Sequence, residues 1–366
     1  MRDRGTQRYR IPRHMQMRAR RNGTLEGWKG GRPHPTFQSS NLPFLLSSLL
    51  DPYFFPVSAY LGLASQSLCA LISGVFSLTV LGSGSGGNCS LVATNRCRVL
   101  IDAGFSARQI AVRLESSGVD PASLDGILIT HEHNDHVAGL EVFCRRFGVP
   151  IYANSRTAEM LRHGWLAEYS TWNLFEPGLS FSLKDIEIQS FYVPHDAVDP
   201  MAFVFSSDDG SIGLLTDLGY APKLALERIR NVHTLVIETN HDERLLQEDP
   251  KRPWSVKQRI MSRHGHLSND AGAQLVAAIA GHRLRRVVLG HLSRDCNRPD
   301  LALEAMDRNG VAGLSLFCAE QNKVSPTFIV DPAPRSTVCD EVNPVHRSCS
   351  KCQDAQTMFD LGWQTG

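Results

Sequence analysis

The chain has 366 residues, of which 42% are hydrophobic, and this is enough apolar material for a sizeable buried core. Its 38 Lys and Arg residues nearly balance its 37 Asp and Glu residues, which leaves a formal charge of +1. This balance excludes a polycation that coats nucleic acid along its whole length, so an anionic partner would have to be bound by local groups.

The first 75 residues are predicted to be a non-core extension made of a basic arm and an apolar segment. Residues 1–37 carry ten basic and two acidic side chains, which is typical of a solvated arm. Residues 56–76 are long enough to cross a bilayer at about 1.5 Å per residue. Membrane association through residues 52–76 and an organellar targeting peptide are therefore the alternatives to a dispensable extension. The Ser, Gln and Gly content of the segment favours the extension.

The nine cysteines are scattered, which favours a reducing compartment, and we expect a cytoplasmic protein. Residues 331–366 have no sustained period and are predicted to be a flexible tail. Cys339, Cys349 and Cys352 lie in this tail with His346, and such a group could bind zinc. Their irregular spacing argues against a zinc site.

Between residues 76 and 330 the expected elements follow one another closely. Strands are predicted for SLTVLG and, as a pair, for SLVATNRCRVLIDAG, and a helix for SARQIAVRLESSG. LDGILITHEHNDHVAGLEVFCRRFG then indicates a buried strand, a histidine-rich turn and a helix. VPIYANSRTAEMLR repeats a strand and a helix.

The second half of this region continues the alternation. LKDIEIQSFYVPHD and AFVFSSDDGSIGLLTDLG predict paired strands, and VHTLVIETNHD predicts another strand. NDAGAQLVAAIAGH is expected to be helical, and LRRVVLGHLS to be a strand that ends in a polar turn. Hairpins combined with crossovers indicate α/β layers with a mixed sheet.

THEHNDH is the strongest functional signal in the chain. His131, His133, Asp135 and His136 directly follow the apolar strand GILI. The strand end places His131 and His133 on one side, and the following helical turn brings Asp135 and His136 to the adjoining side. Burying so many polar groups is costly unless something binds them, and a pair of metal ions would account for all four.

More residues of the ligand type follow apolar runs downstream. They are His195 in YVPHDA, Asp217 in LLTDLG and His291 in VVLGHLS. We expect each to project from the same edge of the sheet, where open α/β folds gather their sites. Each of these residues alone would more often have a structural role, but together with the first cluster they form a set of candidate metal ligands.

This ordered set, over about residues 76–330, resembles the metallo-β-lactamase-fold superfamily. The resemblance implies a four-layer αββα sandwich with mixed β-sheets and a site for two divalent metal ions, Zn²⁺ or Mn²⁺. It implies that one metal is bound by His131, His133 and His195, that the other is bound by Asp135, His136 and His291, and that Asp217 bridges them.

The resemblance also assigns roles to the acids. Asp102 in VLIDAG matches an early aspartate of the superfamily, which supports the ligand loop from behind. The alternative is an ordinary turn or capping aspartate. Asp102, Asp135 and Asp217 are the predicted catalytic acids, and the attacking species is a hydroxide held between the two cations.

Four stretches narrow the resemblance to the YycJ/WalJ branch of exonucleases. These are VLGSGSGGNCSLV, THEHNDHVAGL, IETNHDERLL and RHGHLSNDAG, with VVLGHLSRDCN at the end. The branch implies a phosphodiester hydrolase that degrades DNA from 5′ to 3′. The alternatives are a small-molecule hydrolase for a thioester, lactone or cyclic phosphodiester, and a non-enzymatic metal-binding module.

Two further stretches are predicted to contact substrate. SRHGHLSND precedes an expected helix whose N-terminus would attract phosphate, so we predict a phosphate clamp of His266, Ser268 and Asn269, with helix capping as the alternative. In the glycine-rich GSGSGGN, the residues predicted to touch substrate, unless the turn is purely structural, are Ser83, Ser85 and Asn88. Basic residues around Trp254 add weak support for a DNA partner.

Overall fold

The computed structural model describes residues 75–169, 171–281 and 283–330. Nearly all of the predicted N-terminal extension, and the tail with its cysteines and His346, therefore lie outside the described residues. In the described part of the chain, none of the helices is both long and apolar enough to cross a membrane.

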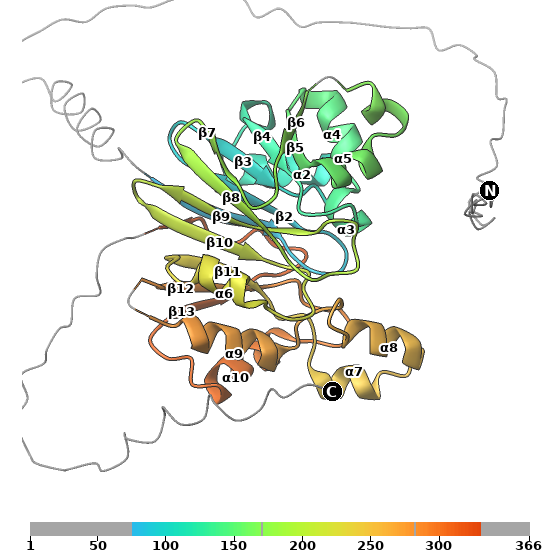
Figure 1. Ribbon diagram of the computed structural model, residues 1–366, viewed down its shortest axis with the longest axis vertical. Helices are drawn as coiled ribbons and strands as arrows, with labels where there is room; N and C mark the ends of the chain where they lie inside the picture. Colours follow the sequence, from blue (N-terminus) through green and yellow to red (C-terminus); the bar gives the residue numbers. More distant parts are fainter. Residues whose placement is uncertain (1–74, 170, 282, 331–366) are drawn as a thin grey trace, which may run out of the picture. The chain divides into compact units, whose positions relative to one another are not determined.

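Two mixed seven-stranded sheets form the centre of the molecule (Figure 1). The first sheet has the strand order β14 (Phe328–Ile329), β1 (Ser77–Gly82), β2 (Cys89–Ala93), β3 (Arg98–Ile101), β4 (Gly126–Leu128), β5 (Ile151–Asn154) and β6 (Trp172–Phe175). The second has the order β13 (Ser315–Cys318), β12 (Arg286–Gly290), β11 (Thr234–Glu238), β10 (Gly210–Leu215), β9 (Met201–Ser207), β8 (Ile186–Tyr192) and β7 (Ser180–Leu183). In each sheet one half is antiparallel and the other half parallel.

Helices cover the outer face of each sheet, so the predicted four-layer αββα sandwich is confirmed (Figure 1). The first sheet is covered by α2 (Ala107–Ser116), α4 (Leu140–Phe147) and α5 (Ser155–Leu161), and the second by α6 (Lys223–Ile229), α9 (Asn269–Ile279) and α10 (Pro299–Arg308). The short elements are η1 (Pro121–Ser123), α3 (Asn134–Val137), η2 (Gly164–Ala167), α7 (Glu243–Glu248) and α8 (Trp254–Ile260).

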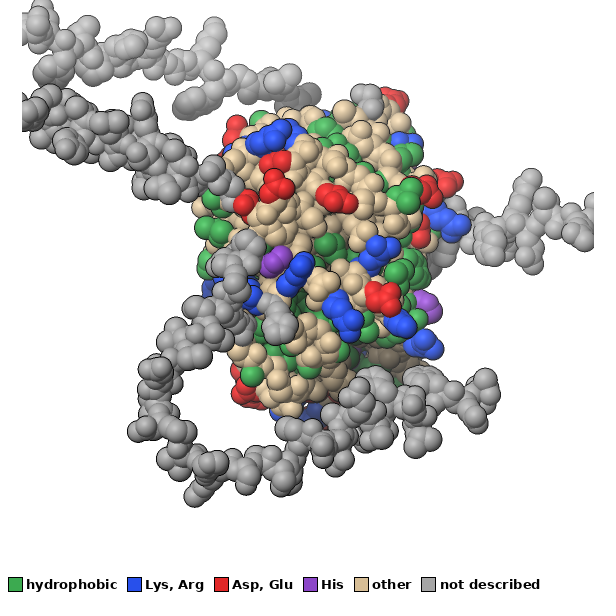
Figure 2. Space-filling view, turned by 60° about the vertical axis from the view of Figure 1, so that its left-hand side comes forward, with side chains coloured by type: hydrophobic (Ala, Val, Ile, Leu, Met, Phe, Trp, Pro, Cys, Tyr) green, Lys and Arg blue, Asp and Glu red, His purple; other side chains and the backbone are tan. Residues whose placement is uncertain are grey.

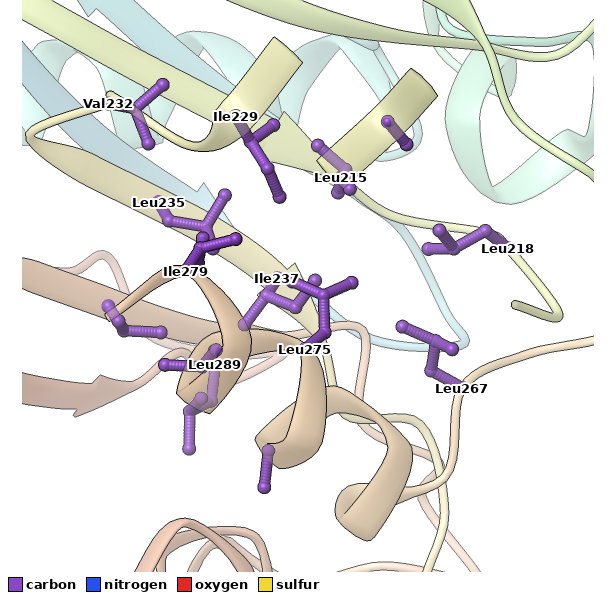
Figure 3. Close-up of a cluster of buried hydrophobic side chains, with 14 of the residues drawn as sticks. Leu215, Leu218, Ile229, Val232, Leu235, Ile237, Leu267, Leu275, Ile279 and Leu289 are labelled. Atoms are coloured by element: carbon purple, nitrogen blue, oxygen red, sulfur yellow. The ribbon is translucent and has the colours of Figure 1, made fainter. Parts of the chain in front are cut away.

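Strand side chains pack on both faces of each sheet, because successive residues of a strand point in opposite directions. In β11, Leu235 and Ile237 pack against the outer helices, whereas Val236 packs in the core between the sheets. Figure 3 shows the outer core, where Leu275 and Ile279 of α9 approach this strand. This double burial explains why central strands such as β11 and β12 contain uninterrupted apolar runs.

The structure differs from the prediction after the histidine-rich turn, where two short helices replace one. The backbone N–H of Gly139 donates to the carbonyl of Ala103 at 2.8 Å, and the carbonyl of Asp135 accepts from Asn88 at 2.8 Å. These two groups would otherwise bond to each other within a continuous helix. The helix therefore breaks between α3 and α4.

The three downstream ligands His195, Asp217 and His291 lie at one edge of the second sheet, as predicted, because β8, β10 and β12 run in the same direction. His131, His133, Asp135 and His136 follow β4 of the first sheet, whereas the remaining ligands follow strands of the second. A pattern of strand ends does not reveal that the chain divides into two sheets.

The molecular surface carries charges of both signs. On the face in Figure 2, acidic and basic side chains are interspersed with apolar ones. This distribution agrees with the near-zero net charge of the whole chain.

Candidate metal centre

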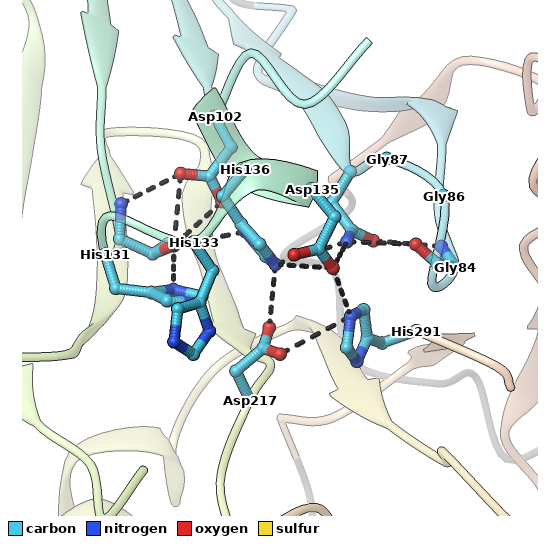
Figure 4. A network of polar contacts seen from close by, with 12 residues as sticks. Gly84, Gly86, Gly87, Asp102, His131, His133, Asp135, His136, Asp217 and His291 are labelled. Carbon is cyan, nitrogen blue, oxygen red and sulfur yellow. Dashed lines mark hydrogen bonds and ion pairs between the residues drawn. The ribbon is translucent and has the colours of Figure 1, made fainter. Parts of the chain in front are cut away.

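The seven predicted ligands converge at the junction of the two sheets. Figure 4 shows the loop after β4 facing Asp217 and His291, which follow β10 and β12. His195 follows β8, and its ring centroid lies 5.0 Å from that of His133 and 5.1 Å from that of His131. The structure thus gathers residues separated by up to 160 positions in the sequence.

Three site residues have left-handed backbones. Asp102, Asp217 and His291 have φ of 60°, 59° and 57°, and only one other non-glycine residue in the described ranges, Lys184, has a positive φ. Each of the three follows the end of β3, β10 or β12. Such conformations cost about 1–3 kcal/mol each and occur mainly at functional sites. At these three positions, the left-handed backbone directs the side chain toward the centre of the site.

The first group of ligand atoms comes from His131, His133 and His195. One ring nitrogen from each lies within 4.8 Å of the others. His131 is buried, and its Nε2 has no hydrogen-bond partner in the described part of the chain. A buried unpaired nitrogen costs about 1–3 kcal/mol, so this donor set fits a divalent cation that would satisfy it.

The second group comes from Asp135, His136 and His291, again within 4.8 Å of one another. Asp217 lies between the two groups. Its Oδ2 is 3.2 Å from His136 Nε2, and its Oδ1 is 3.4 Å from His291 Nε2. Its Oδ1 is also 3.9 Å from His195 Nε2 in the first group. This position suits a carboxylate that is shared by two cations.

Asp102 lies behind the ligand loop. Its Oδ2 is 2.7 Å from His136 Nδ1, and its Oδ1 accepts a hydrogen bond from the backbone N–H of Thr130 at 2.9 Å. Thr130 Oγ1 lies 3.0 Å from His131 Nδ1. Asp102 is therefore a positioning residue that fixes the far side of the histidine rings, and it does not line the site cavity.

Glu238 occupies the equivalent position in the second sheet and is not among the residues predicted from the sequence. It ends β11 and is fully buried. Its Oε1 is 2.8 Å from Nδ1 of both His291 and His266, and its Oε2 accepts from the backbone N–H of Leu218 at 3.0 Å. The available signal was a single acidic residue at the end of the apolar run TLVIE.

Charges within the centre shift its pKa values. Burial alone would lower the pKa of His291, but the carboxylates of Asp217, Asp135 and Glu238 outweigh burial and raise it. Burial would raise the pKa of Asp217, but the neighbouring His291 and His136 hold it well below its ordinary value. In the metal-free centre His291 therefore keeps a proton, and a cation bound by His291 would displace that proton.

A cavity of about 350 Å³ opens beside these residues. Its lining includes four predicted ligands together with His266, Ser85 and two arginines, Arg252 and Arg259. Arg252 contacts Asp249 and Asp295, and Arg259 pairs with Asp196. The cavity thus combines metal-ligating groups with positively charged side chains.

Only part of the predicted phosphate clamp lies at this cavity. His266 lines it, whereas Ser268 caps α9 by accepting a hydrogen bond from the N–H of Ala271 at 3.3 Å. Asn269 is buried and exchanges side-chain hydrogen bonds with Asn297 at 2.9 and 2.8 Å. These two polar side chains are occupied by contacts that stabilise the fold.

Two side chains of the glycine-rich loop, residues 82–88, contact the predicted ligands. Ser83 Oγ accepts from the N–H of His291 at 2.8 Å and donates to Asn88 Oδ1 at 3.0 Å. Asn88 Nδ2 lies 3.2 Å from His136 Nε2. Ser85, from the same loop, reaches the cavity lining. Of the three predicted contacts in this loop, Ser85 is therefore the one that lines the metal-site cavity.

Two curated relatives are similar to most of the described part of the chain. The chain is 39% identical over 230 residues to exodeoxyribonuclease WalJ of Streptococcus pneumoniae strain D39, covering 62% of this chain and 85% of that protein. It is 35% identical over 226 residues to exodeoxyribonuclease YycJ of Bacillus anthracis, covering 61% and 85%.

Solved structures share the fold. The metallo-β-lactamase fold protein YhfI of Bacillus subtilis superposes with a TM-score of 0.54 at 15% identity, covering 68% of this chain and 99% of that chain. Zn²⁺-bound PqqB of Methylobacterium extorquens gives a TM-score of 0.52 at 15% identity, with the same coverage. Residues 97–292 match the family model of the beta-lactamase superfamily domain. The chain therefore belongs to the beta-lactamase superfamily, in its YycJ/WalJ-like branch.

Proposed function

We propose that the protein is a divalent-metal-dependent phosphodiester hydrolase that degrades DNA as a 5′-to-3′ exonuclease. The observation that carries the proposal is the pairing of two ligand groups, joined by Asp217, with a cavity that also contains Arg252 and Arg259. The relatives named exodeoxyribonucleases support DNA as the substrate.

The proposed centre holds two cations, either Zn²⁺ or Mn²⁺, because His and Asp ligands accept both metals. The proposed ligands are His131, His133 and His195 for one cation and Asp135, His136 and His291 for the other, with Asp217 shared. Bound there, the cations would supply an acidified water and offset negative charge on a phosphate.

Side chains of the cavity favour an anionic substrate over a neutral thioester or lactone. Arg252 is three-quarters buried and is held by the two carboxylates of Asp249 and Asp295, so little of its side-chain freedom is lost on binding an anion. His266 is held at Nδ1 by Glu238, which leaves its Nε2 for a phosphate oxygen. In the proposal, these groups bind and orient the DNA end.

We further propose that residues 76–330 are the catalytic domain and that the protein works in a reducing compartment, the cytoplasm. The five cysteines in the described ranges are free, and four of them are buried. Free buried cysteines are typical of proteins in reducing compartments.

The test uses the full chain with Mn²⁺ or Zn²⁺ and 5′-phosphorylated, end-labelled DNA. The expected result is metal-dependent release of nucleotides from the 5′ end, with loss of bound metal and of most activity in His133→Ala. His163→Ala is the matched control, because His163 is exposed and lies outside the site cavity. Turnover of a thioester or lactone without DNA cleavage would overturn the proposal.

A further inference from the structure

We propose that a second cavity, next to the metal-site cavity, binds the nucleoside unit that adjoins the cleaved phosphodiester. This inference rests on the proposed function. The second cavity has a volume of about 330 Å³, at the lower end of the range of about 300–1,000 Å³ for small-molecule sites. It has the capacity for one nucleoside and not for a long segment of DNA.

The two cavities share a wall. Ser293 lines both, and the glycine-rich loop contributes Ser85 to the first and Ser83 to the second. Ser83 also bonds to the backbone of His291, so the wall is attached to the proposed metal ligands. A polymer whose phosphate lies at the metal centre would place an adjoining nucleoside across this wall.

The lining of the second cavity suits a nucleobase better than a phosphate. Leu292, Pro299 and Ala319 provide apolar surface, and the exposed side-chain amide of Asn322 provides hydrogen-bonding groups. Binding sites for small organic groups commonly combine apolar walls with a few placed polar groups. Of the described residues that line the metal-site cavity, Ile260 is the one apolar residue, whereas three apolar residues line the second cavity.

Arg294 supplies a flat cationic surface over this cavity. Its Nη2 lies 3.0 Å from the position that a Cβ at Gly86 would occupy, so the guanidinium packs against the glycine-rich loop. The neighbouring carboxylate of Asp295 is already paired with Lys251 and Arg252. Guanidinium planes stack on bases, and Arg294 is exposed at the site where a base would enter.

Gln321 holds the boundary between the cavities in place. Its Oε1 accepts from the N–H of Gly86 at 2.7 Å, and its Nε2 donates to the carbonyl of Gly87 at 2.8 Å. Gly84 has φ of 150°, and a Cβ there would lie 2.7 Å from Gln321 Oε1. The loop therefore needs glycine to approach Gln321, whose two hydrogen bonds hold the loop at the boundary of the second cavity.

The experiment compares DNA ends that differ by a single base. Full-length protein loaded with Mn²⁺ is given 5′-phosphorylated oligonucleotides with a normal or an abasic first or second nucleotide. The wild-type protein is expected to lose about tenfold in kcat/KM when the base that enters the cavity is missing. Arg294→Ala and the cavity-blocking Asn322→Trp should lose this discrimination, because their kcat/KM on the normal end should fall toward their kcat/KM on the abasic end.

Arg230→Ala is the matched control, because Arg230 is exposed and lies outside both cavities. It should discriminate as the wild type does, and bound metal should be the same in all four proteins. Equal cleavage of normal and abasic ends by the wild type, or unchanged discrimination in both cavity variants, would overturn the inference while leaving the exonuclease proposal intact. A wild-type protein that cleaves no DNA would overturn both.

Discussion

Two buried carboxylates hold histidine rings in the same way from opposite sheets. Asp102 contacts Nδ1 of His136, and Glu238 contacts Nδ1 of His291. A carboxylate at Nδ1 sets the tautomer and the ring orientation, so that Nε2 would be free to bind a metal ion. Nε2 of both rings indeed lies near Asp217. The metal centre is therefore arranged before any cation binds.

Asp102→Asn should weaken metal binding by about tenfold or more, since partners of this kind typically contribute 10–100-fold to affinity or activity. Asparagine keeps the shape and tolerates the left-handed backbone at φ 60°, so the change removes mainly the charge. Competition with a chelating dye measures the affinity, and Asp208→Asn on the surface serves as the control. Unchanged affinity would show that Asp102 acts only in the turn.

His241 should make stability depend on pH. Burial lowers its pKa from an ordinary 6.5 to about 4, and its Nδ1 has no partner in the described part of the chain. Between these two values the unfolded chain binds more protons than the folded one, so the free energy of unfolding falls as pH drops from about 6.5 to 4.

The check is urea unfolding of metal-free protein at pH 7 and pH 5. His241→Gln should show a smaller loss of stability between the two pH values than the wild type, because its side chain does not titrate. The same variant of the exposed His163 should behave like the wild type. Equal losses in wild type and His241→Gln would contradict the assignment.

At the scale of elements, helix α9 illustrates how a polar cluster is divided between fold and site. Ser268 accepts from the N–H of Ala271 and donates to Glu243, whereas His266, two residues earlier, lines the cavity. Ser268 at the start of this helix therefore stabilises the fold, whereas His266 in the preceding loop lines the site cavity.

Ser268→Ala should lower the free energy of unfolding by about 0.5–2 kcal/mol, the usual cost of losing an N-cap. Bound metal and DNA cleavage should stay at wild-type levels at temperatures where the variant is folded. Ser106→Ala, at the N-cap of α2, is the matched control for capping alone. A loss of cleavage with unchanged stability would instead support a phosphate contact by Ser268.

Gly104 sets the distance between the turn after β3 and helix α3. A Cβ there would lie 1.7 Å from the carbonyl oxygen of Asp135, so Gly104→Ala must displace the helix that carries Asp135 and His136. We expect lower stability and loss of bound metal, measured by thermal unfolding and metal analysis. Gly281→Ala is the control, since its nearest contact would be an ordinary 3.6 Å. Full metal content in Gly104→Ala would contradict this packing argument.

For the whole molecule, the proposed ligands come from both sheets, so bound cations would hold the sheets together. Four ligands follow β4 in the first sheet, and His195, Asp217 and His291 follow strands of the second. A cation that binds only the folded chain stabilises it, by about 2.7 kcal/mol at a free concentration 100 times its Kd.

Removing metal with a chelator should therefore lower Tm, and adding Mn²⁺ or Zn²⁺ should restore it. His133→Ala should show a smaller response, because its first ligand group is incomplete, whereas His163→Ala should respond fully. Identical melting curves with and without metal in the wild type would show that no cation joins the two sheets.

Local patterns in the chain were enough to predict the alternation of helices and strands and to single out the side chains that converge at the candidate metal centre. The apolar run around Val236 predicts a buried strand, and the order of His131, His133, Asp135 and His136 after GILI predicts a ligand loop. Such inferences succeed because strand periodicity and residue chemistry are properties of a few consecutive residues.

The features of the fold and of the site that were not predicted depend on contacts between segments far apart in the sequence. The division into two sheets, the role of Glu238 behind His291, the break at Gly139 and the pairing of Asn269 with Asn297 each depend on groups far apart in sequence. A polar side chain before a helix can cap the helix, pair with another residue or face a cavity. The local sequence is compatible with all three roles. Only the packed chain places a partner within hydrogen-bonding distance and so selects among them.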